Sequence, residues 1–86
     1  MINQLLKLNF KIMNITEFLN GLKLQFEDED AIKIIETTIL SDLDTWDSLT
    51  RFSIIAYLED ECEYKFDEKD FEKYKTPESL YNLINK

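Results

Sequence analysis

The first segment with helical spacing of apolar residues begins after a clear start signal. Asn14 is followed three positions later by Glu17, so each side chain can accept a hydrogen bond from the other residue's backbone N–H. Met13 precedes this cap and Phe18 lies four residues into the helix, an arrangement that could form a hydrophobic staple. The pattern predicts a helix from about Ile15 to Gln25.

A second helix is predicted from Asp47 or Ser48, which are both good N-cap residues, to about Glu61. One broad apolar stripe on it is expected to face the core, and this stripe holds Leu49, Phe52, Ile55, Ala56 and Cys62. Three more apolar residues lie off the stripe, namely Ile54, Tyr57 and Leu58. Of these, Ile54 and Tyr57 could form the apolar centre of a docking face or pack under the preceding loop.

Two further helix starts are predicted near the C-terminus. Asp67 can cap a short helix that runs to about Lys73. Thr76 then places a capping side chain before Pro77, and proline is favoured at the first helical position, so a last helix is predicted to start there. The residues expected to face the core from these two helices are Phe71, Tyr74, Leu80, Leu83 and Ile84.

The stretch from Glu27 to Trp46 has no regular periodicity. Its acidic run, Glu27 to Asp30, is expected to be a solvated loop or a helix end, and the apolar residues after it suggest a long loop that dips side chains into the core. A strand from Ile34 to Ile39 is the alternative, but no second strand exists to pair with it. The predicted fold is therefore all-α, a four-helix bundle with three longer helices, one short helix and a long first loop.

The length and the charge of the chain indicate one small acidic domain. The 86 residues include 18 Asp and Glu against 10 Lys and Arg, which gives a net charge of −8. Residues 1–12 contain lysines but no acidic residue, so the chain divides into an N-terminal extension, 1–12, and a more acidic domain, 13–86. Such a surface repels phosphate backbones and anionic membranes and suits partners with basic docking faces. We expect no nucleic-acid or membrane partner.

The residue types that are missing exclude most catalytic chemistry. With no histidine, one glycine and one cysteine, the chain can form no Ser-His-Asp set, no Walker loop and no internal disulfide. We therefore expect no enzyme. The unpaired cysteine, and the lack of any apolar run near the ~20 residues that span a bilayer, fit a cytoplasmic protein. A calcium loop starting at Asp42 is rejected, because its fifth, sixth and twelfth positions are Trp46, Asp47 and Ser53.

One stretch carries a specific motif. The segment from Asp42 to Leu49 reads D-L-D-T-W-D-S-L, and the apolar helix after it ends in the acidic run Glu59-Asp60-Glu61. It resembles the phosphopantetheine attachment site of acyl carrier proteins, in which a D-S-L triplet opens the second of four helices. The resemblance covers about residues 13–86 and is strongest over 40–80. Asp44 stands where fatty-acid carriers usually have glycine, one extra residue separates D-L from D-S-L, and the W-D-S-L spelling resembles a divergent group of stand-alone carriers.

The resemblance implies a monomeric acyl or aminoacyl carrier protein. A phosphopantetheinyl transferase would move the 4′-phosphopantetheine arm from coenzyme A to Ser48, using magnesium, with Asp47 beside the metal. The thiol of the arm would then hold the cargo as a thioester. A helix N-terminus suits a phosphodiester at Ser48, because its first N–H groups are unpaired and its dipole is positive there.

The resemblance also implies that the transferase, and the enzymes that load and transfer the cargo, dock on the second helix through basic faces. The residues expected to contact them are Leu49, Glu59, Asp60, Glu61 and Glu63. Trp46 is expected to anchor the preceding loop to the core, and Cys62 to be buried as a small hydrophobe. The alternative is a small acidic helical interaction module without a prosthetic group, in which Asp47 and Ser48 only cap a helix.

Overall fold

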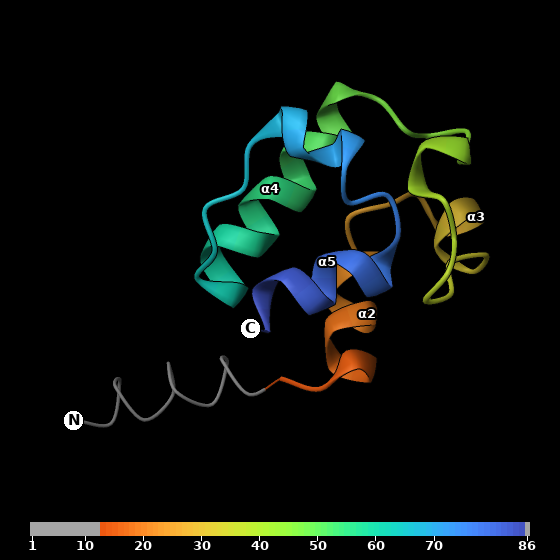
Figure 1. Cartoon of the computed structure of the whole chain (residues 1–86). Coiled ribbons are helices and arrows are strands. Elements are labelled where there is room, and N and C mark those ends of the chain that lie inside the picture. The colour runs from red at the N-terminus through yellow and green to blue at the C-terminus, as the bar shows by residue number, and fades with distance from the viewer. Residues whose placement is uncertain (1–12, 86) are drawn as a thin grey trace.

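The computed structural model describes residues 13–85, and every regular element in that part of the chain is a helix (Figure 1). Three longer helices form the bundle: α2 (Ile15–Lys23), α4 (Ser48–Cys62) and α5 (Pro77–Ile84). The connections carry one short α-helix, α3 (Asp28–Ala31), and two 3₁₀ helices, η1 (Leu40–Asp42) and η2 (Glu68–Glu72). The predicted all-α bundle is confirmed, whereas the extension predicted for residues 1–12 lies outside the described residues.

The longer helices begin at the capping residues expected from the sequence. Asn14 and Glu17 bond each other's backbone N–H groups at 2.8 and 3.0 Å. The Asp47 carboxylate accepts the N–H of Thr50 at 2.8 Å, and Thr76 Oγ1 accepts the N–H of the third residue of α5. Each cap satisfies an N–H group that has no partner within its own helix, which determines where the helix starts.

The core lies where the three longer helices meet. Phe18 and Leu22 of α2, Leu58 of α4 and Leu80 of α5 are all fully buried. Gly21 allows α2 to approach α4 closely, because an added Cβ there would stand 2.6 Å from a ring carbon of Tyr57. The connections complete the core with a set of buried apolar side chains: Phe26, Ile34, Leu40, Phe66 and Phe71.

The apolar stripe predicted to face the core from α4 is wrong at three of its five residues, because Leu49, Phe52 and Ala56 are exposed, whereas Cys62 is buried as expected. Leu49 and Phe52, both expected in the core, are 76% and 58% exposed, whereas Ile54 is fully buried. The buried residues of this helix are Thr50, Ile54, Tyr57, Leu58 and Cys62. The periodicity could not choose between the faces because apolar residues surround much of the helix. Packing against α2 decides, and the Tyr57 hydroxyl donates a hydrogen bond to the Phe18 carbonyl at 3.0 Å.

The long first connection differs in part from the expectation. Most of the acidic run lies in the single-turn helix α3. The last acidic residue of the run, Asp30, is buried at 2% exposure instead of being solvated. Ile34 and Leu40 are buried, as expected of a loop that dips into the core. Two backbone hydrogen bonds tie this connection to the start of α5, from the N–H of Leu40 to the Lys75 carbonyl and from the N–H of Glu78 to the Glu36 carbonyl.

The buried side of α4 can be tested by paired substitutions. Ile54→Ala should lower the free energy of unfolding by about 2–5 kcal/mol because it leaves a cavity in the core. Phe52→Ala should change it by no more than about 1 kcal/mol, because most of that ring is already in water. Urea denaturation followed by circular dichroism measures both values. A larger loss for Phe52→Ala than for Ile54→Ala would contradict the observed orientation of the helix.

Candidate functional site

Ser48 is the first residue of α4 and follows its N-cap, Asp47. The side chain is exposed, and its hydroxyl makes no hydrogen bond within residues 13–85. The unpaired N–H groups and the positive end of the helix dipole lie at this same turn. Ser48 is therefore a primary alcohol that an enzyme could reach, at a point on the surface that favours an added negative charge.

Asp47 has a capping role beside this hydroxyl. Its carboxylate accepts the backbone N–H of Thr50, and this hydrogen bond is the main reason why the pKa of Asp47 lies below its usual value. The carboxylate is consequently ionised at neutral pH. An ionised carboxylate is the kind of oxygen ligand that magnesium and calcium ions take.

A set of hydrogen bonds that no sequence motif predicted fixes the segment before α4. One oxygen of buried Asp30, Oδ2, accepts both the backbone N–H and the hydroxyl of Thr45, at 2.8 and 2.5 Å. The Thr45 carbonyl in turn accepts the hydroxyl of Thr50 at 2.9 Å. The two bonds from Thr45, first the one from its hydroxyl, hold the pKa of Asp30 below its usual value. Together with the Thr50 bond, they connect α3 with the first turn of α4, which contains Ser48.

Trp46 anchors the same segment to the core, as expected from the sequence. Its ring is half-buried and packs against the core, stacked on Phe26 with ring centroids 6.3 Å apart. Its other aromatic contact is edge-on to Phe71 at 5.1 Å. The Arg51 guanidinium lies 5.7 Å from the centre of the Trp46 ring and bonds Glu68 at 2.8 Å. A rigid aromatic contact thus fixes the residue two positions before Ser48.

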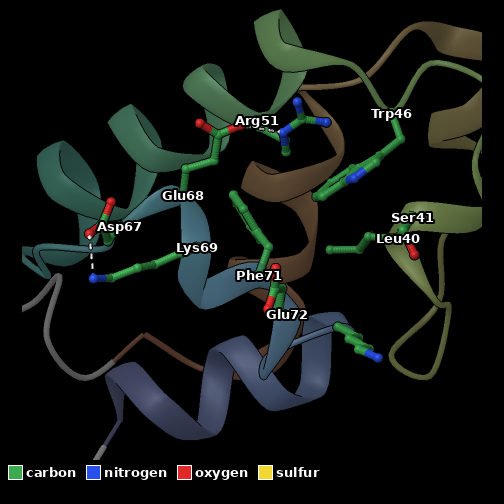
Figure 2. A pocket seen from close by; sticks show the side chains of 10 residues that line it. Leu40, Ser41, Trp46, Arg51, Asp67, Glu68, Lys69, Phe71 and Glu72 are labelled. Carbon is green, nitrogen blue, oxygen red and sulfur yellow. Dashed lines mark hydrogen bonds and ion pairs between the residues drawn. The ribbon is translucent and has the colours of Figure 1, made fainter.

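A surface groove of about 630 Å³ opens on this side of the molecule (Figure 2). Trp46 and Arg51 lie at one end of it, and η2 forms the opposite wall with Glu68, Phe71 and Glu72. The groove is lined by aromatic rings and by charges of both signs. It begins within one helical turn of Ser48 and runs between the start of α4 and η2.

The exposed side of α4 carries most of the residues expected to contact partners. Ser48, Phe52, Ala56 and Asp60 are spaced four residues apart and are all exposed, so they form one row along the helix. Leu49 and Glu59 flank this row and are also exposed. We call this set of six residues the α4 outer face. Phe52 was predicted to be in the core, and its place on this face is a correction.

The acidic residues of this region are not all close to the serine. Glu61 stands about 20 Å from Ser48 along the helix axis, at 1.5 Å of rise per residue. Glu63 lies beyond the last turn, where its left-handed backbone (φ 54°) ends α4. The C-terminal end of the helix is therefore a separate acidic region, about four turns from the candidate attachment site.

Cys62 is a buried core residue, as predicted. Burial, together with the charge of Glu61, raises the pKa of its thiol to about 11. Burial also raises the pKa of the Tyr57 hydroxyl far above its usual value. A thiol that stays protonated at neutral pH is a poor nucleophile. Neither group is available for covalent chemistry, whereas the Ser48 hydroxyl is exposed.

Comparison with protein-family models, with curated proteins and with solved structures found no significant match. Within residues 13–85, no group of three or more acidic, histidine or cysteine side chains is placed to hold a metal ion. No helix in the described part of the chain is long and apolar enough to cross a membrane. The D-S-L motif around Ser48 and the geometry of its surroundings are therefore the features that bear on function.

The buried carboxylate should make stability fall in acid. Because the folded-state pKa of Asp30 is lowered, its contribution is complete above its ordinary pKa of 3.8 and is lost as the pH falls through the lower value. Urea midpoints should therefore drop as the pH falls below about 4. Asp30→Asn should be less stable at pH 7 and should lose less on acidification. An equal drop in both proteins would show that Asp30 does not contribute.

Proposed function

We propose that this protein is an acyl or aminoacyl carrier protein, with its cargo held as a thioester on a 4′-phosphopantetheine arm attached to Ser48. The observation that most supports this is the exposed Ser48 hydroxyl at the first position of α4, flanked by Asp47 and Leu49 in a D-S-L triplet. The surrounding helical bundle agrees with the resemblance to acyl carrier proteins. Such a chain is a substrate of enzymes and not an enzyme itself.

The attachment step is a phosphoryl transfer catalysed by a phosphopantetheinyl transferase. The Ser48 oxygen forms a bond to the phosphorus that carries the pantetheine half of coenzyme A, and the pyrophosphate bond breaks. The nucleotide half leaves with the electron pair of that bond, and the serine proton passes to a base of the transferase. Asp47 would help hold the magnesium ion that neutralises the phosphate charges. The helix N-terminus stabilises the phosphodiester that results.

The α4 outer face is the proposed docking surface for the transferase and for the enzymes that load and use the cargo. Exposed Leu49 and Phe52 provide apolar contacts beside Ser48, and Glu59 and Asp60 provide charge further along the helix. Glu61 and Glu63 would extend the attraction to basic partner faces. With a net charge of −8, encounter with a basic partner should be fast and salt-sensitive. We propose that the protein acts as a cytoplasmic monomer without nucleic-acid or membrane partners.

The groove beside α4 offers a place for the arm when no enzyme is bound. Trp46 and Phe71 provide aromatic walls, and Arg51 and Glu68 provide polar groups at the end near Ser48. A pantetheine arm combines amide groups with short apolar stretches, so a wall of mixed character suits it.

A second candidate function is that of an acidic interaction module with no prosthetic group. It is supported by the exposed apolar side chains Leu49 and Phe52 next to acidic residues on one helix face. Such a surface would bind a partner without any use for the Ser48 hydroxyl. The two functions differ in whether Ser48 becomes modified, so one experiment separates them.

Coexpression with a transferase of broad specificity should load the wild-type protein with one phosphopantetheine group. Ser48→Ala should remain unmodified, because it lacks the oxygen that attacks the phosphorus. Intact-protein mass spectrometry measures both outcomes. The control is Ser53→Ala, a serine more than one turn further along α4, which should be loaded like the wild type. Loading of Ser48→Ala, or no loading of the wild type, would overturn the carrier assignment.

Charge reversal tests the proposed docking face. Replacing Asp60 and Glu61 by lysine should slow the loading of Ser48 at low salt, through a higher KM, because a basic enzyme would be attracted less. The matched control reverses Glu29 and Glu36, which are exposed in the first connection and outside α4, and changes the net charge equally. Wild-type rates for both double variants would show that α4 is not the docking face.

A further inference from the structure

The turn that carries Ser48 is connected to a buried carboxylate on a different helix. Asp30, at 2% exposure, binds Thr45 through both the backbone N–H and the hydroxyl. Thr45 accepts the hydroxyl of Thr50, and the N–H of Thr50 binds the Asp47 carboxylate. We call the three linked residues Asp30, Thr45 and Thr50 the Asp30 network. Along the chain, Ser48 lies between Thr45, which precedes α4, and Thr50, which is in its first turn.

We propose that Asp30 and Thr45 are positioning residues, which hold the Ser48 hydroxyl in the orientation that phosphopantetheinyl transfer requires. The inference rests on the proposed function. It assigns a role in the reaction to Asp30 of α3 and to Thr45, although neither is hydrogen-bonded to Ser48. The physical reason is that group transfer needs the attacking oxygen in line with the leaving group, and small displacements slow it strongly.

The hydrogen bonds of the Asp30 network act on the first turn of α4, and not mainly on the hydrophobic core. The network bonds Thr45, three residues before Ser48, and Thr50, two residues after it. A helix N-terminus without such restraints frays, because its first N–H groups lack partners within the helix. Trp46 adds a third fixed point through its contacts with Phe26 and Phe71. The exposed serine therefore lies in a short segment that is hydrogen-bonded on both sides, at Thr45 and at Thr50.

Burial makes the carboxylate a strong anchor. Removing Asp30 from water is costly unless its oxygens accept hydrogen bonds, so the folded chain strongly favours the conformation in which Thr45 supplies them. The other oxygen of Asp30 lies 3.8 Å from the Lys33 ammonium, within the same connection. An exposed Asp–Thr pair would exchange with water and hold the turn only weakly. The buried position is therefore the feature that suits Asp30 to a positioning role.

The test is steady-state loading by a purified transferase, with the carrier as the varied substrate and coenzyme A saturating. Thr45→Val keeps the shape of the side chain but removes the hydroxyl that binds Asp30. It should lower kcat about tenfold or more, while KM stays within about twofold because the α4 outer face is unchanged. Thr45→Ser restores the hydroxyl and should restore kcat. Asp30→Ala removes the acceptor of both Thr45 bonds and should lower kcat in the same way.

The control is Thr38→Val, a threonine in the same connection whose hydroxyl accepts the N–H of Ile35 and has no link to α4. It should load at the wild-type rate. Rates are measured at several temperatures below each melting point, since a loss caused only by unfolding grows with temperature and a positioning defect does not. Unchanged kcat for both Thr45→Val and Asp30→Ala, or a fall in kcat for Thr38→Val of equal size, would overturn the proposal. Failure of the wild type to load would instead overturn the proposed function.

Discussion

Burial of α4 through Ile54 and Leu58 is the constraint on which the rest of the structure depends. Both side chains are fully buried, and Tyr57 between them bonds the backbone of α2. A helix buried along one side must turn the opposite side to solvent. Ser48 and Phe52 lie on that opposite side, so the exposure of the candidate site follows from the packing of the core.

One buried carboxylate connects this core to the site. In a chain with a net charge of −8, most acidic side chains remain in water, where repulsion is weak. Asp30 is the exception, since it is buried among the residues of the first connection and is satisfied by Thr45. Through its hydrogen bonds with Thr45, it links α3 to the first turn of α4 and so fixes part of an otherwise irregular connection.

The residues at the centre of the candidate site were predictable from sequence, and their supports were not. Asp47 and Ser48 stand out because capping chemistry is local and a three-residue motif can be read directly. Asp30 and Thr45 are 15 residues apart and form no spacing that marks a contact. Asp30 also belongs to an acidic run, and such runs are usually solvated. Only the folded chain shows that one member of that run is buried.

Local rules in the sequence determined the helix starts, the all-α class and the place of Ser48 at the mouth of a helix. Helix caps and proline act over a few residues, so both partners of each interaction are close together in the sequence. The tertiary structure decided which side of α4 is buried, and therefore that Phe52 is outside and Ile54 inside. This choice depends on the shapes of α2 and of the connections packed against the helix. When apolar residues surround a helix, periodicity cannot select a face, and only the partner surface can.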